Sequence, residues 1–191
     1  MIPLFKVYMS KNAKSEVGKV LDSGFIGQGP VTEKFEEELE KTFDKGTVVT
    51  TNSGTAAEHL AFRLLMNPDT NQKVFDSMGS TTSTWPGIKD GDEALCTPLT
   101  CTATNWPVLA NGMKIKWVDV DTETLNMDLD DLERKLSPKT KVIYVVHWGG
   151  NPIDLNRLKR IQSKCFNLYG FKPAIIEDCA HAFGARFEGK P

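Results

Sequence analysis

The sequence predicts an α/β fold with a mostly parallel central sheet and helices on both of its faces. From residue 47 to residue 191, short apolar or β-branched segments alternate with segments whose apolar residues recur at helical spacing. Such alternation is typical of βαβ units, which build parallel sheets. The segment 141–147 is almost continuously apolar, which indicates a central strand that is buried on both faces.

The composition limits the class of protein. The chain has 191 residues and a net charge of −2, so we expect a single domain with a real core and no basic surface for nucleic acid. Its apolar runs are shorter than the ~20 residues that span a bilayer, and no signal peptide or membrane partner is expected. The four cysteines show no C-x-x-C spacing, which favours free thiols in a cytoplasmic protein.

The expected helices are defined by their apolar period and by their end signals. Residues 31–43 carry an apolar residue at every fourth position. On the helix after Ser53, the expected core-facing stripe is Ala57, Leu60, Ala61, Leu64 and Leu65. A short amphipathic segment runs from Ser15 to Leu21. Further helices are expected from about Thr102 to Asn111, after Asp128, and over 155–168.

The expected strands precede most of these helices. β-branched residues indicate a strand at 47–51, and two more strands are expected at 93–97 and 114–120. The apolar run that begins at Ala174 indicates a buried strand that ends in carboxylates. Residues 186–191 resemble an edge strand that enters a turn.

Two stretches stand apart from this alternation of strands and helices. The N-terminal segment 1–30 ends in a loop rich in glycine, which is either a linker or a loop that approaches a ligand or a partner subunit. Residues 67–92 are long for a structureless connection, so we interpret them as an inserted loop or a functional lid. The apolar residues Val74, Phe75 and Trp85 would hold it in place locally.

A turn that leads into a helix has the features of an anion site. Gly54 lets a ligand approach the backbone, and Thr55 supplies a hydroxyl. The N–H groups of Thr55, Ala56 and Ala57 are expected to be free at the positive end of the helix dipole. The alternative is an ordinary helix cap by Ser53 or Thr55. No Walker loop and no G-x-G-x-x-G motif follows a strand, which disfavours enzymes of nucleoside triphosphates and of nicotinamide cofactors.

Asp178 stands at the carboxyl end of the last buried strand, where open α/β sheets bind ligands. Its carboxylate is placed either to cap a loop or to pair with a cationic ring nitrogen, as pyridoxal phosphate (PLP) requires. His181 either lies against such a ring or is a buried histidine with satisfied hydrogen bonds. Metal binding by His147, Cys179 and His181 would need their convergence, and we expect no metal site.

Seven segments follow one another in a recognisable order. They are SGFIGQGP, VTEKFEEELEKTF, TNSGTAAEHLA, CTPLTCTATNWPVLANG, WVDVDTETLNMD, SPKTKVIYVVHWGGNPIDL and IIEDCAHAFGARFEGKP. In this order they resemble the DegT-type PLP-dependent sugar aminotransferases, which are fold-type-I enzymes. The resemblance covers nearly the whole chain except residues 67–92. It implies that residues 1–191 form an incomplete large PLP-binding domain.

The resemblance implies roles for particular residues. The turn Gly54–Ala56 would hold the PLP phosphate, Asp178 would pair with the pyridinium, and His181 would lie beside the cofactor as a possible auxiliary group. Cys101 stands where much of the family has an aromatic residue that stacks on the cofactor. Stacking is therefore expected to be weaker here or to come from another residue.

The resemblance also implies an activity. Family members transfer an amino group, usually from glutamate, to a keto group on a nucleotide-linked sugar, and they act as homodimers with shared active sites. The family's Schiff-base lysine lies downstream of the last matching segment, and Lys190 matches a glycine-lysine turn instead. We therefore expect the N-terminal part of such an enzyme, truncated and inactive unless another chain supplies the lysine.

Two alternatives to an aminotransferase stay open. The first is a PLP-dependent sugar dehydratase, in which a histidine replaces the lysine at a position that this sequence does not contain. The second is a non-catalytic remnant that binds a sugar nucleotide or a partner subunit.

Overall fold

The computed structural model describes residues 7–43, 47–68, 73–74, 81–82 and 85–191. The chain divides into two compact units, Met1–Thr50 and Thr51–Pro191. Among the described residues, no helix has the length and the apolar character that crossing a membrane requires. The assignment of the whole chain to one incomplete domain stays a prediction.

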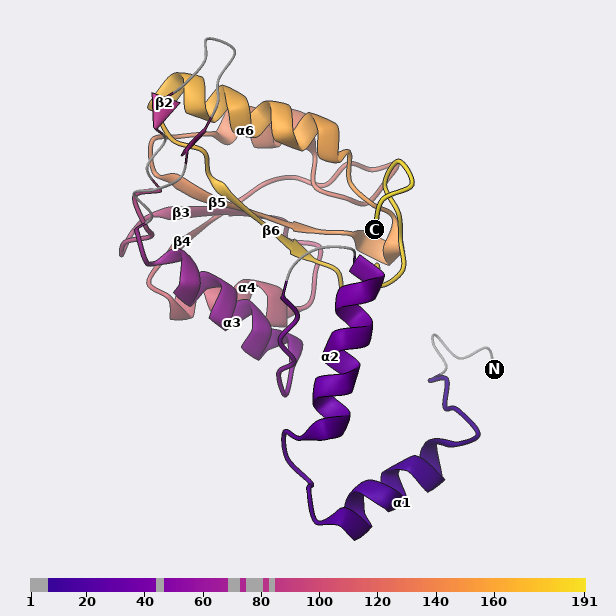
Figure 1. The fold of residues 1–191 in the computed structure, drawn as a ribbon. Coiled ribbons are helices and arrows are strands. Elements are labelled where there is room, and N and C mark those ends of the chain that lie inside the picture. The colour runs from indigo at the N-terminus through magenta and orange to yellow at the C-terminus, as the bar shows by residue number, and fades with distance from the viewer. Residues whose placement is uncertain (1–6, 44–46, 69–72, 75–80, 83–84) are drawn as a thin grey trace. The chain divides into compact units, whose positions relative to one another are not determined.

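The first unit contains two helices joined by the glycine-rich loop (Figure 1). Helix α1 (Ala13–Ser23) ends at Gly24, whose left-handed backbone with φ of 75° suits glycine. Helix α2 (Pro30–Phe43) begins at a proline, which fits the first helical turn because it needs no N–H acceptor there. Helix α2 confirms the helix expected at 31–43, and α1 contains the amphipathic segment 15–21. A hollow of about 680 Å³ with a largely apolar lining lies between them.

The strand expected at 47–51 is wrong, because the structure has no strand over these residues. The Val48 N–H donates to Glu40 Oε1 at 3.1 Å. Thr50 donates to Glu36 Oε1 through its N–H and through its hydroxyl, each at 2.7 Å. Carboxylates of α2 therefore accept hydrogen bonds from these residues that a neighbouring strand would otherwise accept.

The second unit is built on a four-stranded parallel sheet in the order β4-β3-β5-β6, which confirms the predicted fold class. The strand β5 pairs on both sides and is buried along most of its length, as a central strand should be. The strands are β3 (Glu93–Cys96), β4 (Lys114–Trp117), β5 (Thr140–Val146) and β6 (Ala174–Asp178).

Helices cover both faces of this sheet (Figure 1). Helices α3 (Gly54–Leu65) and α4 (Thr102–Ala110) lie on one face. Helices α5 (Leu129–Lys135) and α6 (Leu155–Tyr169) lie on the other face. All four helices were expected from the sequence. A short 3₁₀ turn, η1 (Trp148–Gly150), follows β5 at the carboxyl edge of the sheet.

The alternation of side chains along β5 divides the core into two layers. Val142 and Tyr144 pack with Phe62 on the α3 and α4 side. Ile143 and Val145 pack on the α5 and α6 side. The rings of Phe62 and Tyr144 meet edge to face with centroids 5.5 Å apart. Burying a phenylalanine in this way stabilises the fold by about 1.5–3 kcal/mol, so this contact fixes how α3 sits on the sheet.

Helix α3 packs on the sheet with only part of the stripe that the sequence predicted: Leu65 packs against the core, but Leu60 and Leu64 do not. Leu60 and Leu64 are 51% and 71% exposed, whereas Phe62 is fully buried. Apolar residues lie on more than one side of this helix, so the period alone could not select the packed side. Phe62 selects it by packing against Tyr144. Glu58, one helical turn before Phe62, therefore lies on the side that faces the sheet.

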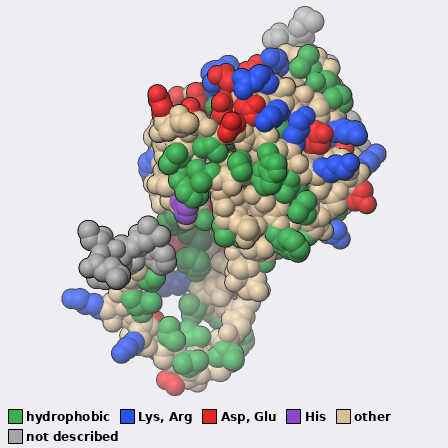
Figure 2. Space-filling model, turned by 180° about the vertical axis from the view of Figure 1, so that it is seen from behind, with side chains coloured by type: hydrophobic (Ala, Val, Ile, Leu, Met, Phe, Trp, Pro, Cys, Tyr) green, Lys and Arg blue, Asp and Glu red, His purple; other side chains and the backbone are tan. Residues whose placement is uncertain are grey.

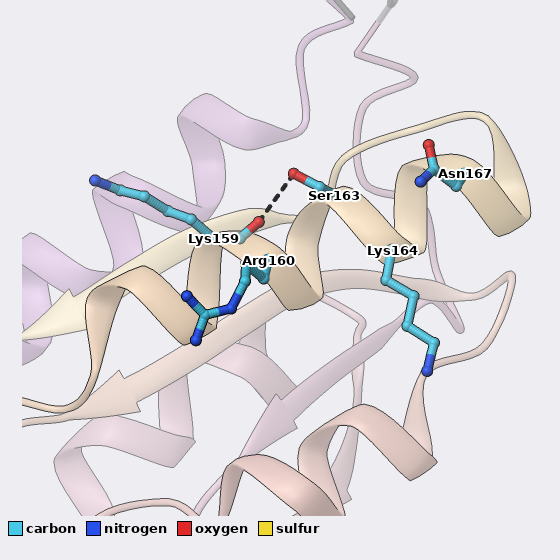
Figure 3. A pocket seen from close by; sticks show the side chains of 5 residues that line it. All are labelled: Lys159, Arg160, Ser163, Lys164 and Asn167. Atoms are coloured by element: carbon cyan, nitrogen blue, oxygen red, sulfur yellow. Dashed lines mark hydrogen bonds between the residues drawn. The ribbon is translucent and has the colours of Figure 1, made fainter. Parts of the chain in front are cut away.

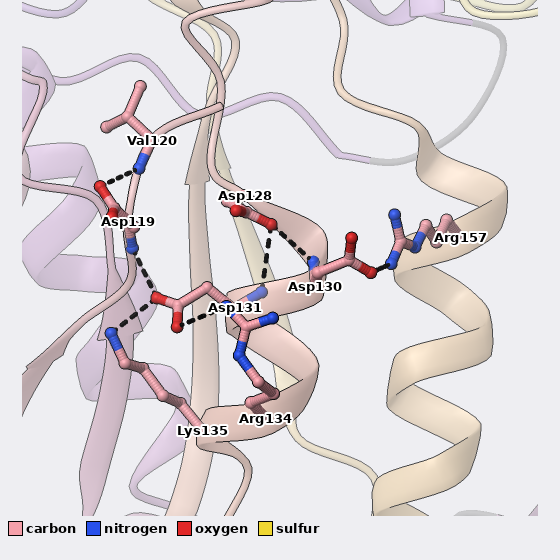
Figure 4. Close-up of polar contacts among 8 residues, drawn as sticks. All are labelled: Asp119, Val120, Asp128, Asp130, Asp131, Arg134, Lys135 and Arg157. Carbon is pink, nitrogen blue, oxygen red and sulfur yellow. Dashed lines mark hydrogen bonds and ion pairs between the residues drawn. The ribbon is translucent and has the colours of Figure 1, made fainter. Parts of the chain in front are cut away.

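Helix α5 begins at Asp128, as expected (Figure 4). The Asp128 carboxylate accepts the N–H groups of Asp130 and Asp131 at 2.8 and 3.1 Å. The Asp131 carboxylate in turn accepts the Asp119 N–H at 2.8 Å. Arg157 of α6 pairs with Asp130. These contacts join α5, α6 and the segment after β4 on the face of the sheet opposite α3.

The inserted loop expected at 67–92 is described only in part. The strands β1 (Lys73–Val74) and β2 (Thr81–Thr82) form an antiparallel pair. The Trp85 indole N–H donates to a backbone carbonyl of α3 at 2.8 Å, so Trp85 does hold this segment in place. Phe75 lies outside the described residues.

The edge strand expected at 186–191 is wrong, although the turn is present. Phe187 and Lys190 form one antiparallel bridge. Their N–H groups each donate to the other's carbonyl oxygen, at 2.9 and 3.0 Å. The two residues therefore bond to each other and not to the sheet.

Candidate functional site

Polar side chains at the carboxyl edge of the sheet are divided between its two faces. Along β6, Ile176 packs on the α3 and α4 side, and Asp178 follows two residues later on the same side. Ile175 packs on the α5 and α6 side, and Glu177 follows it. Glu177 Oε2 lies 2.9 Å from Nε2 of His147, which confirms this division. Asp178 therefore faces the helices that carry the predicted anion site.

The Asp178 carboxylate is fixed from two directions. Thr104 Oγ1 of α4 donates to its Oδ2 at 2.8 Å, and the Ala180 N–H donates to its Oδ1 at 3.0 Å. Thr104 is 2% exposed, and its Oγ1 lies 2.7 Å from Thr100 Oγ1. A carboxylate has about four acceptor positions, so Asp178 can accept a further N–H from a ligand.

The N-terminus of α3 differs from the sequence prediction in one respect. Ser53 caps it: its Oγ accepts the Ala56 N–H at 3.2 Å and its carbonyl accepts the Ala57 N–H at 3.1 Å. These two N–H groups are therefore paired, as in the alternative of a helix cap. The N–H groups of Gly54 and Thr55 have no partner in the described part of the chain. With the Thr55 hydroxyl they form the donors that remain for an anion.

Glu58 and Tyr144 belong to this face and were not identified from the sequence. Glu58 Oε2 and Tyr144 Oη are buried and make no hydrogen bond of normal geometry to any described residue. Burial raises the pKa of Glu58 to about 7, and the nearby Asp178 carboxyl adds to this increase, while the Tyr144 hydroxyl opposes it. Burial and Glu58 also raise the pKa of Tyr144. The sequence offers no local signal for them, because the side of α3 that carries Glu58 is fixed only by the contact of Phe62 with Tyr144.

His181 lies in the turn after β6 and is held by η1. The Gly149 N–H donates to His181 Nδ1 at 3.3 Å, so the ring proton of the neutral form is on Nε2. The edge of the Trp148 ring meets the His181 ring with centroids 5.2 Å apart. At Gly150, where φ is 83°, a Cβ would lie 2.9 Å from the His181 carbonyl oxygen. The glycines of η1 thus allow a close approach that leaves His181 Nε2–H for a ligand.

Cys101 is exposed and occupies the N-cap position of α4 without a capping hydrogen bond from its side chain. Its carbonyl accepts the Thr104 N–H at 3.1 Å. Within the described residues, no hydrogen bond joins the Cys101 side chain to Asp178 or to His181. The structure therefore links the Asp178 carboxylate to Thr104 of α4 and to Ala180, and the thiol of Cys101 takes no part in these hydrogen bonds.

His147 lies on the opposite face and belongs to the framework around β6. Contacts with the Cys179 thiol and the Glu177 carboxylate raise the pKa of His147. The Ile153 N–H donates to His147 Nδ1 at 3.2 Å, however, and this needs an unprotonated Nδ1. We therefore assign the neutral ring that donates from Nε2 to Glu177. Among the described residues, no group of three His, Cys, Asp or Glu side chains is placed to hold a metal ion.

A hollow of about 340 Å³ on α6 offers no comparable site (Figure 3). Its cationic side chains point in different directions, and Lys164 pairs with Glu133. Figure 2 shows Lys and Arg side chains among Asp and Glu side chains on the face that it presents, in keeping with the net charge of −2. The residues that line the hollow are Lys159, Arg160, Ser163, Lys164 and Asn167.

A parallel sheet with a fixed carboxylate at its carboxyl edge and free donors at a facing helix N-terminus is the arrangement at which open α/β proteins commonly bind anionic ligands. The model of the DegT/DnrJ/EryC1/StrS aminotransferase family matches residues 7–191, and the chain belongs to this family. This finding confirms the resemblance that the seven segments indicate.

Known relatives agree with this assignment. The chain is 44% identical to the sugar aminotransferase CalS13 from Micromonospora echinospora, with a TM-score of 0.84 over 100% of this chain and 46% of that one. It is 32% identical to the GDP-perosamine synthase of Escherichia coli O157:H7, over 99% of this chain and 45% of the relative.

A third relative contains the cofactor. The structure of the E. coli GDP-4-keto-6-deoxy-D-mannose-3-dehydratase with bound hydrated PLP is 26% identical, with a TM-score of 0.81 over 99% of this chain and 43% of that one. PLP is thus the cofactor of this family, which confirms the cofactor prediction. The chain spans less than half the length of each of these relatives.

Proposed function

We propose that the carboxyl edge of the sheet is a PLP site and that the protein acts as a sugar aminotransferase. In this proposal an amino group passes from glutamate to a keto group on a nucleotide-linked sugar. The observation that carries it is the Asp178 carboxylate, which Thr104 and Ala180 hold at the end of β6. Membership of the family and similarity to CalS13 and to GDP-perosamine synthase support the choice of reaction and substrate.

The residues of the site fit the cofactor's chemical groups. A phosphate dianion matches the free N–H groups of Gly54 and Thr55, the Thr55 hydroxyl and the positive end of the α3 dipole. Ala56 would share its N–H between Ser53 and the phosphate. Asp178 would accept the N–H of the pyridinium and keep that nitrogen protonated.

When bound, PLP supplies an electron sink that stabilises negative charge on the substrate carbon. The chain's own residues would orient the group: Asp178 at the ring nitrogen and the N-terminus of α3 at the phosphate. His181 would donate from Nε2 beside the ring. Cys101, whose thiol is smaller than an aromatic ring, would leave that face of the cofactor less covered.

Pyridoxamine phosphate (PMP) tests the site, because it binds without a Schiff-base lysine and the proposed site residues include none. We expect titration calorimetry to show binding of PMP to the protein. Asp178→Asn should weaken it at least about tenfold, since a charged hydrogen bond to the pyridinium is lost. Asp22→Asn makes the same change at an exposed position and should have no effect. Equal affinities of the two variants would contradict the role of Asp178.

The proposed contact between Thr55 and the cofactor phosphate needs a separate test. Thr55→Val should weaken PMP but leave the weaker binding of pyridoxamine, which lacks the phosphate, nearly unchanged. Thr102→Val, at the exposed start of α4, is the matched control. A similar loss of affinity for both ligands would show that Thr55 does not bind phosphate.

A dehydratase is the second candidate, because the chain is 26% identical to a PLP-containing sugar 3-dehydratase. The two reactions give different products from a nucleotide-linked keto sugar and glutamate. An aminotransferase replaces the keto oxygen by an amino group and forms one 2-oxoglutarate for each amino sugar. A dehydratase instead removes a hydroxyl group from the sugar. Mass spectrometry separates these outcomes when a chain that carries the Schiff-base lysine is also present. Binding without either product under that condition would favour the non-catalytic alternative.

We also infer that the protein forms a homodimer in the cytoplasm. The family resemblance supports the homodimer, and the four free cysteines suit a reducing compartment. Light scattering tests the oligomeric state: a mass of twice the chain's 21.2 kDa is expected, and a monomer would contradict the inference.

A further inference from the structure

We propose that Glu58 is a positioning residue for the cofactor's ring nitrogen. Glu58 and Asp178 would form a carboxyl pair that holds one proton on the α3 side of the sheet, with Glu58 as the protonated member until the ring nitrogen binds. The inference rests on the proposed function, because the ring nitrogen is that of PLP.

The placement of Glu58 follows from the packing of α3. Phe62 is fully buried against Tyr144, and this fixes the rotation of the helix. Glu58, four residues earlier, then points to the same side, and its Oε2 has no contact with solvent. The charge of the nearby Asp178 carboxyl raises the pKa of Glu58, while the Tyr144 hydroxyl lowers it. A buried ionised group without partners is costly, so a carboxyl group without an ordinary hydrogen bond at this place favours its protonated form.

The proton of the pair belongs on Glu58. Two neighbouring carboxyl groups cannot both ionise without a large cost in repulsion. Asp178 accepts two hydrogen bonds, from Thr104 and Ala180, and such donors favour the charged form. Glu58 Oε2 accepts none from the described residues. Burial raises the pKa of Glu58 to about 7, in agreement with this assignment.

The other groups that face Glu58 stay neutral near this pH. Burial raises the pKa of Tyr144 on β5, and it raises the pKa of Cys96 on β3, beyond Tyr144, to about 12. Helix α4 carries no charged residue. His59, the neighbour of Glu58 on α3, lies 3.4 Å from Asn111 through its Nδ1 and so points away. The charge of Glu58 is therefore set mainly by burial and by Asp178.

A cationic ring nitrogen at Asp178 changes this balance. The positive charge attracts an ionised Glu58 and lowers its pKa, so that binding releases a proton from Glu58. The site then offers a second negative charge to the pyridinium. The affinity of the wild-type protein should accordingly increase as the pH rises through about 7, relative to a variant that cannot ionise. If binding lowers the pKa of Glu58 by one unit, the affinity should gain roughly tenfold across this pH range.

The first test compares PMP affinities from pH 5.5 to 8.5 by titration calorimetry. Glu58→Gln keeps a hydrogen-bond donor but cannot ionise, and Glu123→Gln makes the same change at an exposed position. Ionisations of PMP itself are common to all three proteins and cancel in the ratios. We expect the ratio of the Glu58→Gln dissociation constant to that of the wild type to rise roughly tenfold across this range, while the control ratio stays near one. A flat or falling ratio would overturn the proposal.

The second test needs no cofactor and no variant that might lose affinity for another reason. Carboxyl carbons of ¹³C-labelled glutamate are followed by NMR in the wild-type protein, with Glu58→Gln used only to assign the signal. We expect the Glu58 carboxyl of the free wild-type protein to titrate with a midpoint near 7. Relative to this value, the midpoint should be lower in Asp178→Asn, and it should also be lower in the wild type with PMP bound. A midpoint near the ordinary value of 4.5 would refute the carboxyl pair.

The two tests separate this inference from the proposed function. If PMP does not bind but Glu58 titrates near 7, the proposed PLP site is wrong while the carboxyl pair stands. If PMP binds through Asp178 but Glu58 titrates at its ordinary value, the proposed function stands and the role of Glu58 is wrong.

Discussion

Replacing Thr104 by valine should loosen Asp178 while leaving the space around it filled. Thr104 is 2% exposed, and its Oγ1 donates to Asp178 Oδ2 at 2.8 Å. Valine has nearly the same shape, so α4 keeps its packing, while the hydrogen bonds of Thr104 Oγ1 with Asp178 and with Thr100 Oγ1 are lost. Such bonds stabilise proteins by about 1.5–3 kcal/mol, and because Asp178 is only half-buried we expect the lower end, about 1.5 kcal/mol.

Urea unfolding measures this loss, and calorimetry with PMP measures its effect on the site. A carboxylate that can rotate should bind the ring nitrogen less well, and we expect the dissociation constant to rise roughly tenfold. Thr102→Val makes the same chemical change at an exposed position of α4 and should alter the free energy of unfolding by less than about 0.5 kcal/mol. If the two variants have the same stability and the same affinity, Thr104 does not position Asp178, and the reasoning fails.

Three further predictions concern α3. Ser53→Ala removes the cap that accepts the Ala56 N–H and should lower the free energy of unfolding in urea by about 1 kcal/mol, and an unchanged value would contradict the cap. Phe62→Ala should cost about 3–5 kcal/mol in the same assay and Leu64→Ala less than about 0.5 kcal/mol, whereas equal losses would favour the stripe expected from the sequence. The pKa of Glu58 is about 7 in the folded protein against an ordinary 4.5, so the folded state binds the extra proton between these values and stability must fall as the pH rises through this window. Because the Glu58 side chain is partly exposed, we expect the free energy of unfolding to fall across this window by about 1–2 kcal/mol relative to Glu58→Gln. Parallel plots of unfolding free energy against pH for the two proteins would contradict this prediction.

The sheet could be predicted because its signals are local. The apolar run of β5 and the alternation of strands and helices specify a parallel sheet without knowledge of tertiary contacts. The strand expected at 47–51 shows the limit of such signals. β-branched residues indicate an extended backbone, but they do not say whether a strand or the side chains of Glu36 and Glu40 will accept its hydrogen bonds.

For the candidate site too, the residues with local sequence signals could be predicted and those that depend on long-range contacts could not. Asp178 and Gly54 could be identified because a strand end and a helix start are visible in the sequence. Thr104 could not, because its contact with Asp178 spans 74 positions of the chain. Glu58 could not either, since apolar residues on several sides of α3 leave its rotation open until Phe62 is seen to pack on Tyr144.

The ring nitrogen of bound PMP tests the central claim most directly. With ¹⁵N in the ring, the NMR shift of this atom reports whether it carries a proton. At a pH where free PMP has lost this proton, the ring nitrogen should stay protonated in the wild-type complex and become neutral in Asp178→Asn. A neutral nitrogen in the wild-type complex, or a protonated one in both proteins, would show that Asp178 is not its partner.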